Sequence, residues 1–306
     1  NVTGVQTCAL PIYVAKAGVS GALISNKEKC PTDLAAICVS DTRVGLGQLA
    51  ASWRAKHPIP LALVTGSGKR RVGFEVARSL GQAGFRVILH YQTSRAEAED
   101  SVQELASEGV VAEALQADLA NEGEALALVK QVRESHGRID ALVTCASRWG
   151  RQSLAEVDAN SLLEQFRANT LTTALVSLAA GRIMVEQPEG GAIVTVGDWA
   201  LRRPYVDHLA YHTSKGAVAA FTRALAVELG RQNPRVRVNM VEPGPVMLPP
   251  DLSEDERQEA IGATLVRREG SPKDVAGAVL ALVENGFITG ACLPVDGGRS
   301  IWAGGL

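Results

Sequence analysis

Several features are scarce in this sequence, and each shortage argues against a class of protein. The 306 residues contain five cysteines and no Cys-x-x-Cys pair, which argues against a disulfide framework or a zinc site and favours a reducing compartment. Lys and Arg number 31 and Asp and Glu 33, so no basic field exists to hold nucleic acid or an anionic membrane. No uninterrupted apolar run approaches the roughly 20 residues that span a bilayer, and no signal-peptide pattern opens the chain. We therefore expect a soluble, cytoplasmic protein without a metal site, a nucleic-acid partner or a membrane partner.

The composition is that of a folded chain, with 46% hydrophobic and 21% charged residues. From residue 61 onward, apolar runs alternate with amphipathic segments, which predicts a doubly wound parallel α/β sheet of the Rossmann type in a single domain. Ligands of such folds bind at the carboxyl ends of the strands. The expected strands are 61–64, 85–91, 110–116, 141–143, 192–196, 236–241 and 292–295, and the expected helices are 72–84, 95–108, 122–136, 160–185, 214–229 and 272–284.

The first 58 residues differ from the rest. Residues 1–12 resemble a translated sequencing adapter, with a natural terminal tail as the alternative. Residues 13–58 carry short apolar strands at 21–25 and 35–39 and an amphipathic helix at 44–54. Residues 13–64 resemble part of the N-terminal domain of muramyl-peptide ligases. The ATP-binding pattern GxxxxGK[ST] is not completed, because Arg70 follows Gly68-Lys69. We interpret 13–58 as a partial α/β fragment in a chimera, with a natural fusion as the alternative, and 59–306 as one complete domain.

A glycine-rich turn follows the first strand of that domain. Glycines allow the backbone to approach a pyrophosphate, and the next helix offers N–H groups and a partial positive charge. The turn resembles the TGxxxGxG of short-chain dehydrogenase/reductases, although its first and last glycines are seven residues apart where six is usual. The resemblance implies that the turn binds a dinucleotide through Thr65, Gly66, Ser67, Lys69, Arg70, Arg71 and Gly73.

The end of the second strand decides the expected cofactor. It reads Tyr91-Gln92-Thr93-Ser94-Arg95 and lacks the carboxylate that NAD enzymes place against the ribose. Ser94, Arg95 and the cations of the turn would instead donate charge-assisted hydrogen bonds to a 2′-phosphate, so we predict NADPH, with Tyr91 as a further residue of the cofactor site. The resemblance further implies that Asp118 and Leu119, after the third strand, contact the adenine.

The motif Tyr211-x-x-x-Lys215 places a phenol and an ammonium four residues apart on one helix face. The Lys charge is expected to lower the Tyr pKa and to let the phenol transfer a proton. In the short-chain family this pair follows the glycine turn at a similar distance. The resemblance implies that Tyr211 is the proton donor, that Lys215 tunes it and holds the ribose, and that Asn169 carries a water relay to Lys215.

The position that the family usually gives to a catalytic Ser, thirteen residues before the Tyr, is Asp198. An ionised carboxylate only accepts hydrogen bonds, so it suits a substrate with N–H or amino donors. This departure resembles the pteridine-reductase branch. The resemblance implies that Ala146 and Ser147 line the cofactor site and that Trp149 stacks a pterin, with Asp198 and Tyr211 as further substrate contacts.

Downstream, Pro243-Gly244-Pro245-Val246 resembles the segment whose backbone meets the nicotinamide amide, through Pro243, Gly244 and Val246. Residues 247–263 are then expected to form a mobile substrate loop. We predict an NADPH-dependent reductase of a pteridine-like C=N substrate. The alternatives are reduction of a ketone or 3-oxoacyl thioester on the same fold and a non-catalytic NADP-binding regulator. The family also implies a homo-oligomer, a tetramer or dimer, formed through helices that begin near residues 160 and 214.

Overall fold

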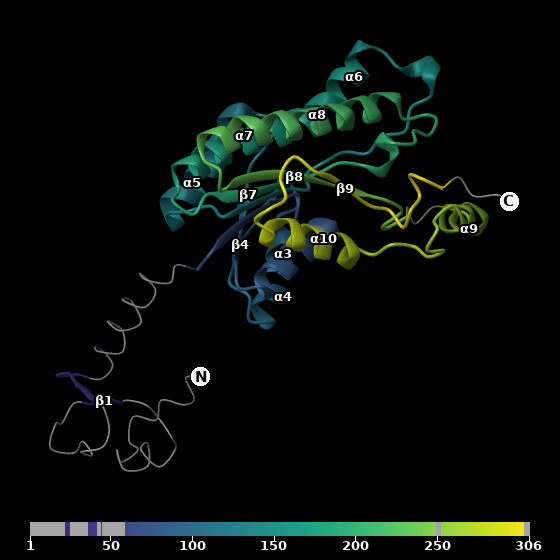
Figure 1. Ribbon diagram of the computed structural model, residues 1–306. Coiled ribbons are helices and arrows are strands. Elements are labelled where there is room, and N and C mark those ends of the chain that lie inside the picture. The colour runs from purple at the N-terminus through teal and green to yellow at the C-terminus, as the bar shows by residue number, and fades with distance from the viewer. Residues whose placement is uncertain (1–21, 25–35, 42–43, 45–58, 249–251, 303–306) are drawn as a thin grey trace. The chain divides into compact units, whose positions relative to one another are not determined.

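The computed structural model describes residues 22–24, 36–41, 44, 59–248 and 252–302 (Figure 1). The chain divides into two compact units, one ending at Ile59 and the other beginning at Pro60. In the first unit, β1 (Ala22–Ile24) pairs in parallel with β2 (Ala36–Cys38), within the predicted strands 21–25 and 35–39. The predicted leader 1–12 and, apart from Val44, the predicted helix 44–54 lie outside the described residues. The origins proposed for residues 1–58 stay predictions.

The second unit is built on one sheet of seven parallel strands in the order β5-β4-β3-β6-β7-β8-β9. The two halves of the sheet extend in opposite directions from the neighbouring strands β3 and β6, which confirms the predicted doubly wound, Rossmann-type fold. The strands are β3 (Leu61–Thr65), β4 (Arg86–Tyr91), β5 (Ala112–Gln116), β6 (Ala141–Thr144), β7 (Gly191–Val196), β8 (Val236–Pro243) and β9 (Cys292–Val295).

Helices cover both faces of this sheet (Figure 1). On one face lie α3 (Val72–Gln82), α4 (Arg95–Ser107) and α10 (Pro272–Glu284), and on the other α5 (Glu122–His136), α7 (Thr172–Glu186) and α8 (Leu209–Gln232). Because side chains alternate along a strand, each strand supplies both cores. In β3, Ala62 and Val64 join the core under α3 and α10, whereas Leu61 and Leu63 join the core under α5, α7 and α8. Both sets are fully buried, which explains why β3 reads as a continuous apolar run.

Strand register brings three chain segments to one level at the carboxyl edge of the sheet. Thr65 of β3 pairs with Thr144 of β6, and Thr144 pairs with Thr195 of β7. All three threonines are buried. The segments that leave the sheet just beyond this row are the ones that the sequence marked for cofactor and substrate: the glycine turn, residues 145–149 and residues 196–199.

The long predicted helix at 160–185 is interrupted. It consists of α6 (Ala159–Gln165), a π-helical segment η3 (Phe166–Leu171) and α7. By length and composition alone the stretch Ala159–Glu186 is apolar enough to cross a membrane, with a mean hydropathy of 1.2, although it holds no long run free of polar residues. In the structure 56% of this apolar window is buried inside the protein, as in the core helix of a globular domain.

Two further segments differ from the sequence-based expectation. Helix α8 begins at Leu209 and not at 214, so Tyr211 lies in its first turn. Part of the predicted loop 247–263 is helical, because α9 (Glu254–Gly262) starts at a capping box in which Ser253 and Glu256 exchange hydrogen bonds. Residues 249–251 lie outside the described part.

Candidate active site

The predicted catalytic side chains Tyr211 and Asp198 meet at the end of β7. Tyr211 Oη donates a hydrogen bond to Asp198 Oδ2 at 2.7 Å. The other carboxylate oxygen, Oδ1, accepts the amide of Ala200 at 2.8 Å, because Asp198 caps the short helix η4 (Trp199–Leu201). Only 5% of Tyr211 is exposed. The carboxylate is therefore held at both oxygens and is aimed at the phenol.

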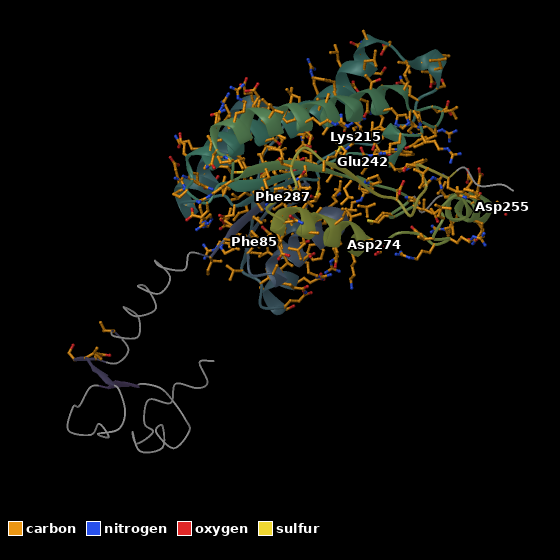
Figure 2. The ribbon with its side chains drawn as sticks, in the orientation of Figure 1. Phe85, Lys215, Glu242, Asp255, Asp274 and Phe287 are labelled. Carbon is orange, nitrogen blue, oxygen red and sulfur yellow. The ribbon has the colours of Figure 1, made fainter. Side chains whose placement is uncertain are left out.

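Lys215 lies one helical turn after Tyr211, between α8 and the sheet (Figure 2). Its Nζ donates to the carbonyl oxygen of Val196 at 2.9 Å and lies 6.0 Å from the centre of the Tyr211 ring. Only 3% of the side chain is exposed. The ammonium and the phenol thus share one helix face, as the sequence spacing predicts.

Burial dominates the electrostatics of this pair. It lowers the pKa of Lys215 to about 8, against the opposing influence of Asp198 and then Cys145. Burial, and after it the charge of Asp198, raises the pKa of Tyr211 well above its ordinary value. A Tyr211 pKa below its ordinary value, the net result expected from the sequence, is wrong for this arrangement, because burial and then the carboxylate at 2.7 Å favour the protonated phenol.

Asn169 lies inside the π-helical segment and is almost fully buried. Its amide nitrogen donates to Ser214 Oγ at 3.0 Å, and Ser214 Oγ donates to the carbonyl oxygen of Tyr211 at 2.7 Å. Its Oδ1 accepts the amide of Arg148 at 2.7 Å. Asn169 therefore ties α8 and the segment after β6 together, and among the described residues its hydrogen bonds lead through Ser214 to the Tyr211 backbone and not to Lys215. The π segment, which is frequent at functional sites, carries no sequence signal.

The glycine turn packs tightly against the segment after β6. Gly66 has φ +64°, and a Cβ there would come within 2.7 Å of the Ala146 backbone. The amide of Ala146 donates to Thr65 Oγ1 at 3.3 Å. Ser67 and Gly68 donate their amides to the carbonyl of His90, so these two amides are committed within the fold. No acceptor among the described residues takes the amides of Val72 and Gly73, at the uncapped start of α3.

The cations of the turn are exposed and mostly paired with carboxylates of α4. Lys69 Nζ lies 3.5 Å from Glu97, Arg70 Nη2 lies 2.6 Å from Glu104, and Arg95 Nε lies 2.8 Å from Glu99. Arg71 is exposed. Such exposed pairs contribute about 0–1 kcal/mol each, so an incoming phosphate can compete for these cations.

Other predicted cofactor residues have clear local roles. Tyr91 ends β4 and Ser94 precedes the first residue of α4, both beside Gly68, whose added Cβ would meet Tyr91 Cβ and Ser94 Oγ. Asp118 Oδ1 accepts the amide of Ala120 at 3.0 Å. Leu119 is buried in a small apolar cluster with α5, so its side chain is part of the core. Ser147 is exposed.

Trp149 belongs to an aromatic cluster, and sequence reasoning missed the other members. Its Nε1 donates to Tyr205 Oη at 3.2 Å, and its ring lies 4.7 Å from the His208 ring. Tyr205 in turn lies 4.6 Å from His212 and 5.8 Å from Trp199. Trp149 is still 52% exposed, so one side remains accessible. The four-residue spacing of His208 and His212 at the start of α8 is the sequence signal for this cluster, whereas Tyr205 and Trp199 lie outside that helix.

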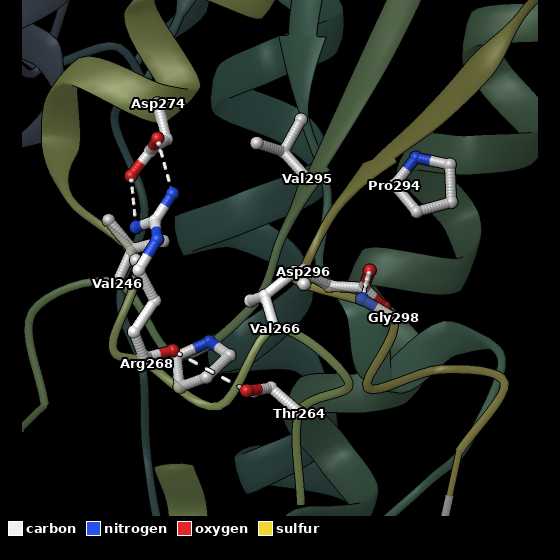
Figure 3. A pocket seen from close by; sticks show the side chains of 12 residues that line it. Val246, Thr264, Val266, Arg268, Asp274, Pro294, Val295, Asp296 and Gly298 are labelled. Atoms are coloured by element: carbon white, nitrogen blue, oxygen red, sulfur yellow. Dashed lines mark hydrogen bonds and ion pairs between the residues drawn. The ribbon is translucent and has the colours of Figure 1, made fainter.

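The segment Pro243-Gly244-Pro245-Val246 lies against the loop after β9. The amide of Gly244 donates to Val295 at 3.0 Å, and an added Cβ there would come within 2.5 Å of Asp296 Cα. Val246 is buried and lines a pocket of about 320 Å³ (Figure 3). In that pocket Arg268 forms two 3.0 Å hydrogen bonds with Asp274. Asp198, Tyr211 and Lys215 do not line it, so it is separate from the Tyr211 group.

Residues 67–300 match the family model described as enoyl-(acyl carrier protein) reductase. The chain is 31% identical over 237 residues to a 3-oxoacyl-[acyl-carrier-protein] reductase of Rattus norvegicus, covering 77% of this chain and 96% of the relative.

Two solved structures share the fold. An acetoin dehydrogenase from Enterobacter cloacae superimposes with a TM-score of 0.72 at 28% identity, covering 80% of this chain and 96% of that one. A blue fluorescent protein from a metagenomic library, in complex with NADPH, gives a TM-score of 0.71 at 30% identity, covering 78% and 97%.

The buried ammonium makes stability depend on pH. A lysine pKa lowered from 10.5 to about 8 means that the unfolded chain binds more protons than the folded one between these pH values. Lys215 alone is therefore expected to make the free energy of unfolding rise with pH through this window, by up to roughly 3 kcal/mol, whereas Cys145, whose pKa burial raises to about 12, acts in the opposite direction above pH 9. Lys215→Met should abolish this rise in denaturant titrations at pH 7.5 to 10. The exposed Lys130→Met serves as the control and should keep it. A rise that persists in Lys215→Met would assign it to another group.

Proposed function

The chain belongs to the short-chain dehydrogenase/reductase family of oxidoreductases, and from that premise we propose that it is an NADPH-dependent reductase of a ketone carbonyl, such as a 3-oxoacyl thioester. The observation that carries the proposal is the buried Tyr211 hydroxyl, one helical turn from the buried Lys215 ammonium, at the carboxyl edge of the sheet. The similarity to 3-oxoacyl and acetoin enzymes supports a ketone substrate.

In this mechanism bound NADPH would supply the hydride that reduces the carbonyl carbon. Tyr211 would give its hydroxyl proton to the carbonyl oxygen, so that the C=O group becomes an alcohol. The substrate oxygen would replace Asp198 as the acceptor of the Tyr211 hydrogen bond, and that exchange removes the contact that holds the phenol protonated. The Lys215 charge would then stabilise the phenolate left after proton transfer. Asn169 would hold α8 in place through Ser214.

The described residues fit a phosphorylated dinucleotide. The amides of Val72 and Gly73 at the start of α3 are available to a pyrophosphate, and the helix dipole favours an anion there. The end of β4 carries Tyr91 and no carboxylate. Arg71 and the weakly paired Lys69, Arg70 and Arg95 lie on exposed surface near it and would favour a 2′-phosphate. One similar structure holds NADPH, which is consistent with this choice.

A pteridine-like substrate, the main expectation from the sequence, becomes the second candidate. Asp198 favours it, because its ionised form accepts hydrogen bonds from ring N–H and amino groups and cannot donate one to a ketone. Trp149 offers a half-exposed indole for stacking. The named relatives act on 3-oxoacyl groups or acetoin, so they support the ketone and not the pterin. A non-catalytic NADP-binding regulator is disfavoured, because Asn169, Tyr211 and Lys215 are all present. Cytoplasmic location and association into dimers or tetramers stay predictions.

The substrate proposal is tested by NADPH oxidation with an acetoacetyl thioester and, separately, with dihydrobiopterin. The kcat/KM for the thioester is expected to be at least about tenfold higher than the kcat/KM for dihydrobiopterin. Tyr211→Phe should lower kcat by roughly 10²–10⁴-fold, the usual contribution of a positioned acid, with NADPH binding unchanged. Retention of more than a few per cent of kcat would refute the role of Tyr211. Tight NADPH binding without turnover of either substrate would favour the regulator.

Asp198→Ser separates the two substrate classes. Serine restores a hydroxyl donor for a ketone oxygen and removes the acceptor for pterin amino groups. We expect thioester turnover to be kept or raised and any dihydrobiopterin turnover to fall at least about tenfold, a loss typical of a hydrogen bond to a charged group. Steady-state kinetics with both substrates provide the measurement. Equal losses with both would contradict this division of roles.

Cofactor choice depends on the exposed cations near the end of β4. NADPH is expected to have a kcat/KM at least about tenfold higher than that of NADH, because each charge-assisted phosphate contact contributes about 1.5–3 kcal/mol. Arg71→Glu and Arg95→Glu should each reduce this preference. Arg231→Glu, in the last turn of α8, is the matched charge reversal and should leave it intact. Comparable efficiencies of the wild type with both cofactors would sink the NADPH assignment.

A further inference from the structure

His90, near the end of β4, is a buried titratable residue that the mechanism above does not use. Only 3% of it is exposed. Its Nδ1 lies 3.1 Å from the amide nitrogen of Gly66 in the glycine turn, and its Nε2 lies 3.0 Å from the carbonyl oxygen of Ala117 just after β5. The imidazole therefore bridges two segments that flank β4 on either side and that are far apart in the sequence.

The two partners fix the protonation state of the ring. A backbone amide can only donate and a backbone carbonyl can only accept. Nδ1 must therefore be the bare acceptor for Gly66, and Nε2 must carry the proton that is donated to Ala117. The neutral ring is also the one that burial favours: burial lowers the pKa of His90, against weaker opposing effects of Ala117 and Asp118.

The next two residues of the turn, Ser67 and Gly68, are hydrogen-bonded to the backbone of His90. The carbonyl of His90 accepts the amides of Ser67 and Gly68 at 3.1 and 3.3 Å, and the amide of His90 donates to Ser67 Oγ at 3.2 Å. Gly66 adopts a left-handed conformation against the Ala146 backbone, where no side chain larger than that of glycine fits. The imidazole is thus the side-chain contact that sets the direction of the Gly66 peptide.

We propose that His90 is a positioning residue for the dinucleotide: by joining Gly66 to Ala117 it fixes the spacing between the phosphate-binding turn and the segment Ala117-Asp118-Leu119 at the adenine end. This inference rests on the proposed NADPH-dependent function. His90 itself touches neither the substrate nor the reacting atoms. Its loss should therefore weaken cofactor binding and leave the chemical step nearly intact.

Three full-length variants separate the two contacts. His90→Leu fills the apolar volume and makes neither hydrogen bond. His90→Asn can place an oxygen near the position of Nδ1 and accept from Gly66, but it is too short to reach Ala117. His90→Gln can place an amide near the position of Nε2 and donate to Ala117, but it cannot serve Gly66 at the same time. Gln187→Leu is the control, because it removes another buried side chain with three backbone hydrogen bonds, to Ile139 and Gly190 at the opposite end of the strands.

The readouts are the Kd for NADPH by titration calorimetry, kcat and KM for NADPH, and the melting temperature. His90→Leu should raise Kd and KM for NADPH about tenfold or more, because the Gly66 peptide loses the side-chain hydrogen bond that orients it, with kcat at saturating NADPH within about threefold of wild type. His90→Asn should recover most of the affinity, because it restores the Gly66 contact. Gln187→Leu should lower the melting temperature and leave Kd unchanged.

A wild-type Kd in His90→Leu, together with a melting temperature lowered as in Gln187→Leu, would overturn the inference and leave a structural role for His90. A fall in kcat without a change in Kd would overturn it as well. If the wild-type protein itself binds no NADPH, the proposed function fails, and this inference fails with it. If the wild type binds NADPH and the His90 variants bind it equally well, this inference alone fails.

Discussion

The parallel hydrogen-bonded register of β3, β6 and β7 is the constraint on which the rest of the structure depends. It aligns Thr65, Thr144 and Thr195 in one buried row and so sends the glycine turn, the Trp149 segment and the Asp198 segment out of the same edge. A parallel sheet keeps all its carboxyl ends on one side, and its helices return the chain along the faces. Groups from these three segments can therefore meet at this edge although the segments are far apart in the chain.

This arrangement places charge where solvation is poor. Lys215 and Tyr211 are both almost fully buried, and Asp198 is the acidic partner that both share electrostatically. The free energy spent on desolvating the ammonium is offset in part by the Val196 carbonyl and by the carboxylate. A substrate oxygen that replaces Asp198 Oδ2 as the acceptor of the Tyr211 hydrogen bond removes the effect of this carboxylate on the phenol. Substrate binding and proton transfer are therefore coupled at Tyr211 Oη.

Most of the fold follows from the sequence because its central strands β3, β6 and β7 are mostly apolar runs and most of its helices are amphipathic, and the ends of α5, α10 and β9 are predicted to the residue. Asn169, Asp198, Tyr211 and Lys215 are likewise brought into one region. What the sequence does not reveal depends on tertiary context. The π segment has no sequence pattern that sets it apart from the flanking helices, and the pairing of Lys69 and Arg70 needs α4 alongside the turn. The Tyr211 pKa depends on a distance to Asp198 that no spacing rule supplies.

The π segment also has a consequence for how this chain tolerates changes in length. A π turn holds one residue more than an α turn, so it absorbs the angular offset, about 100°, that a single extra residue introduces between α6 and α7. Removing one residue there would restore an uninterrupted α-helix, and either Asn169 would rotate away from Ser214 or α7 would rotate its apolar face away from the sheet. The number of residues between α6 and α7 therefore sets their relative rotation about the helix axis. Helices of similar composition that differ in length by one residue in this stretch would not be interchangeable.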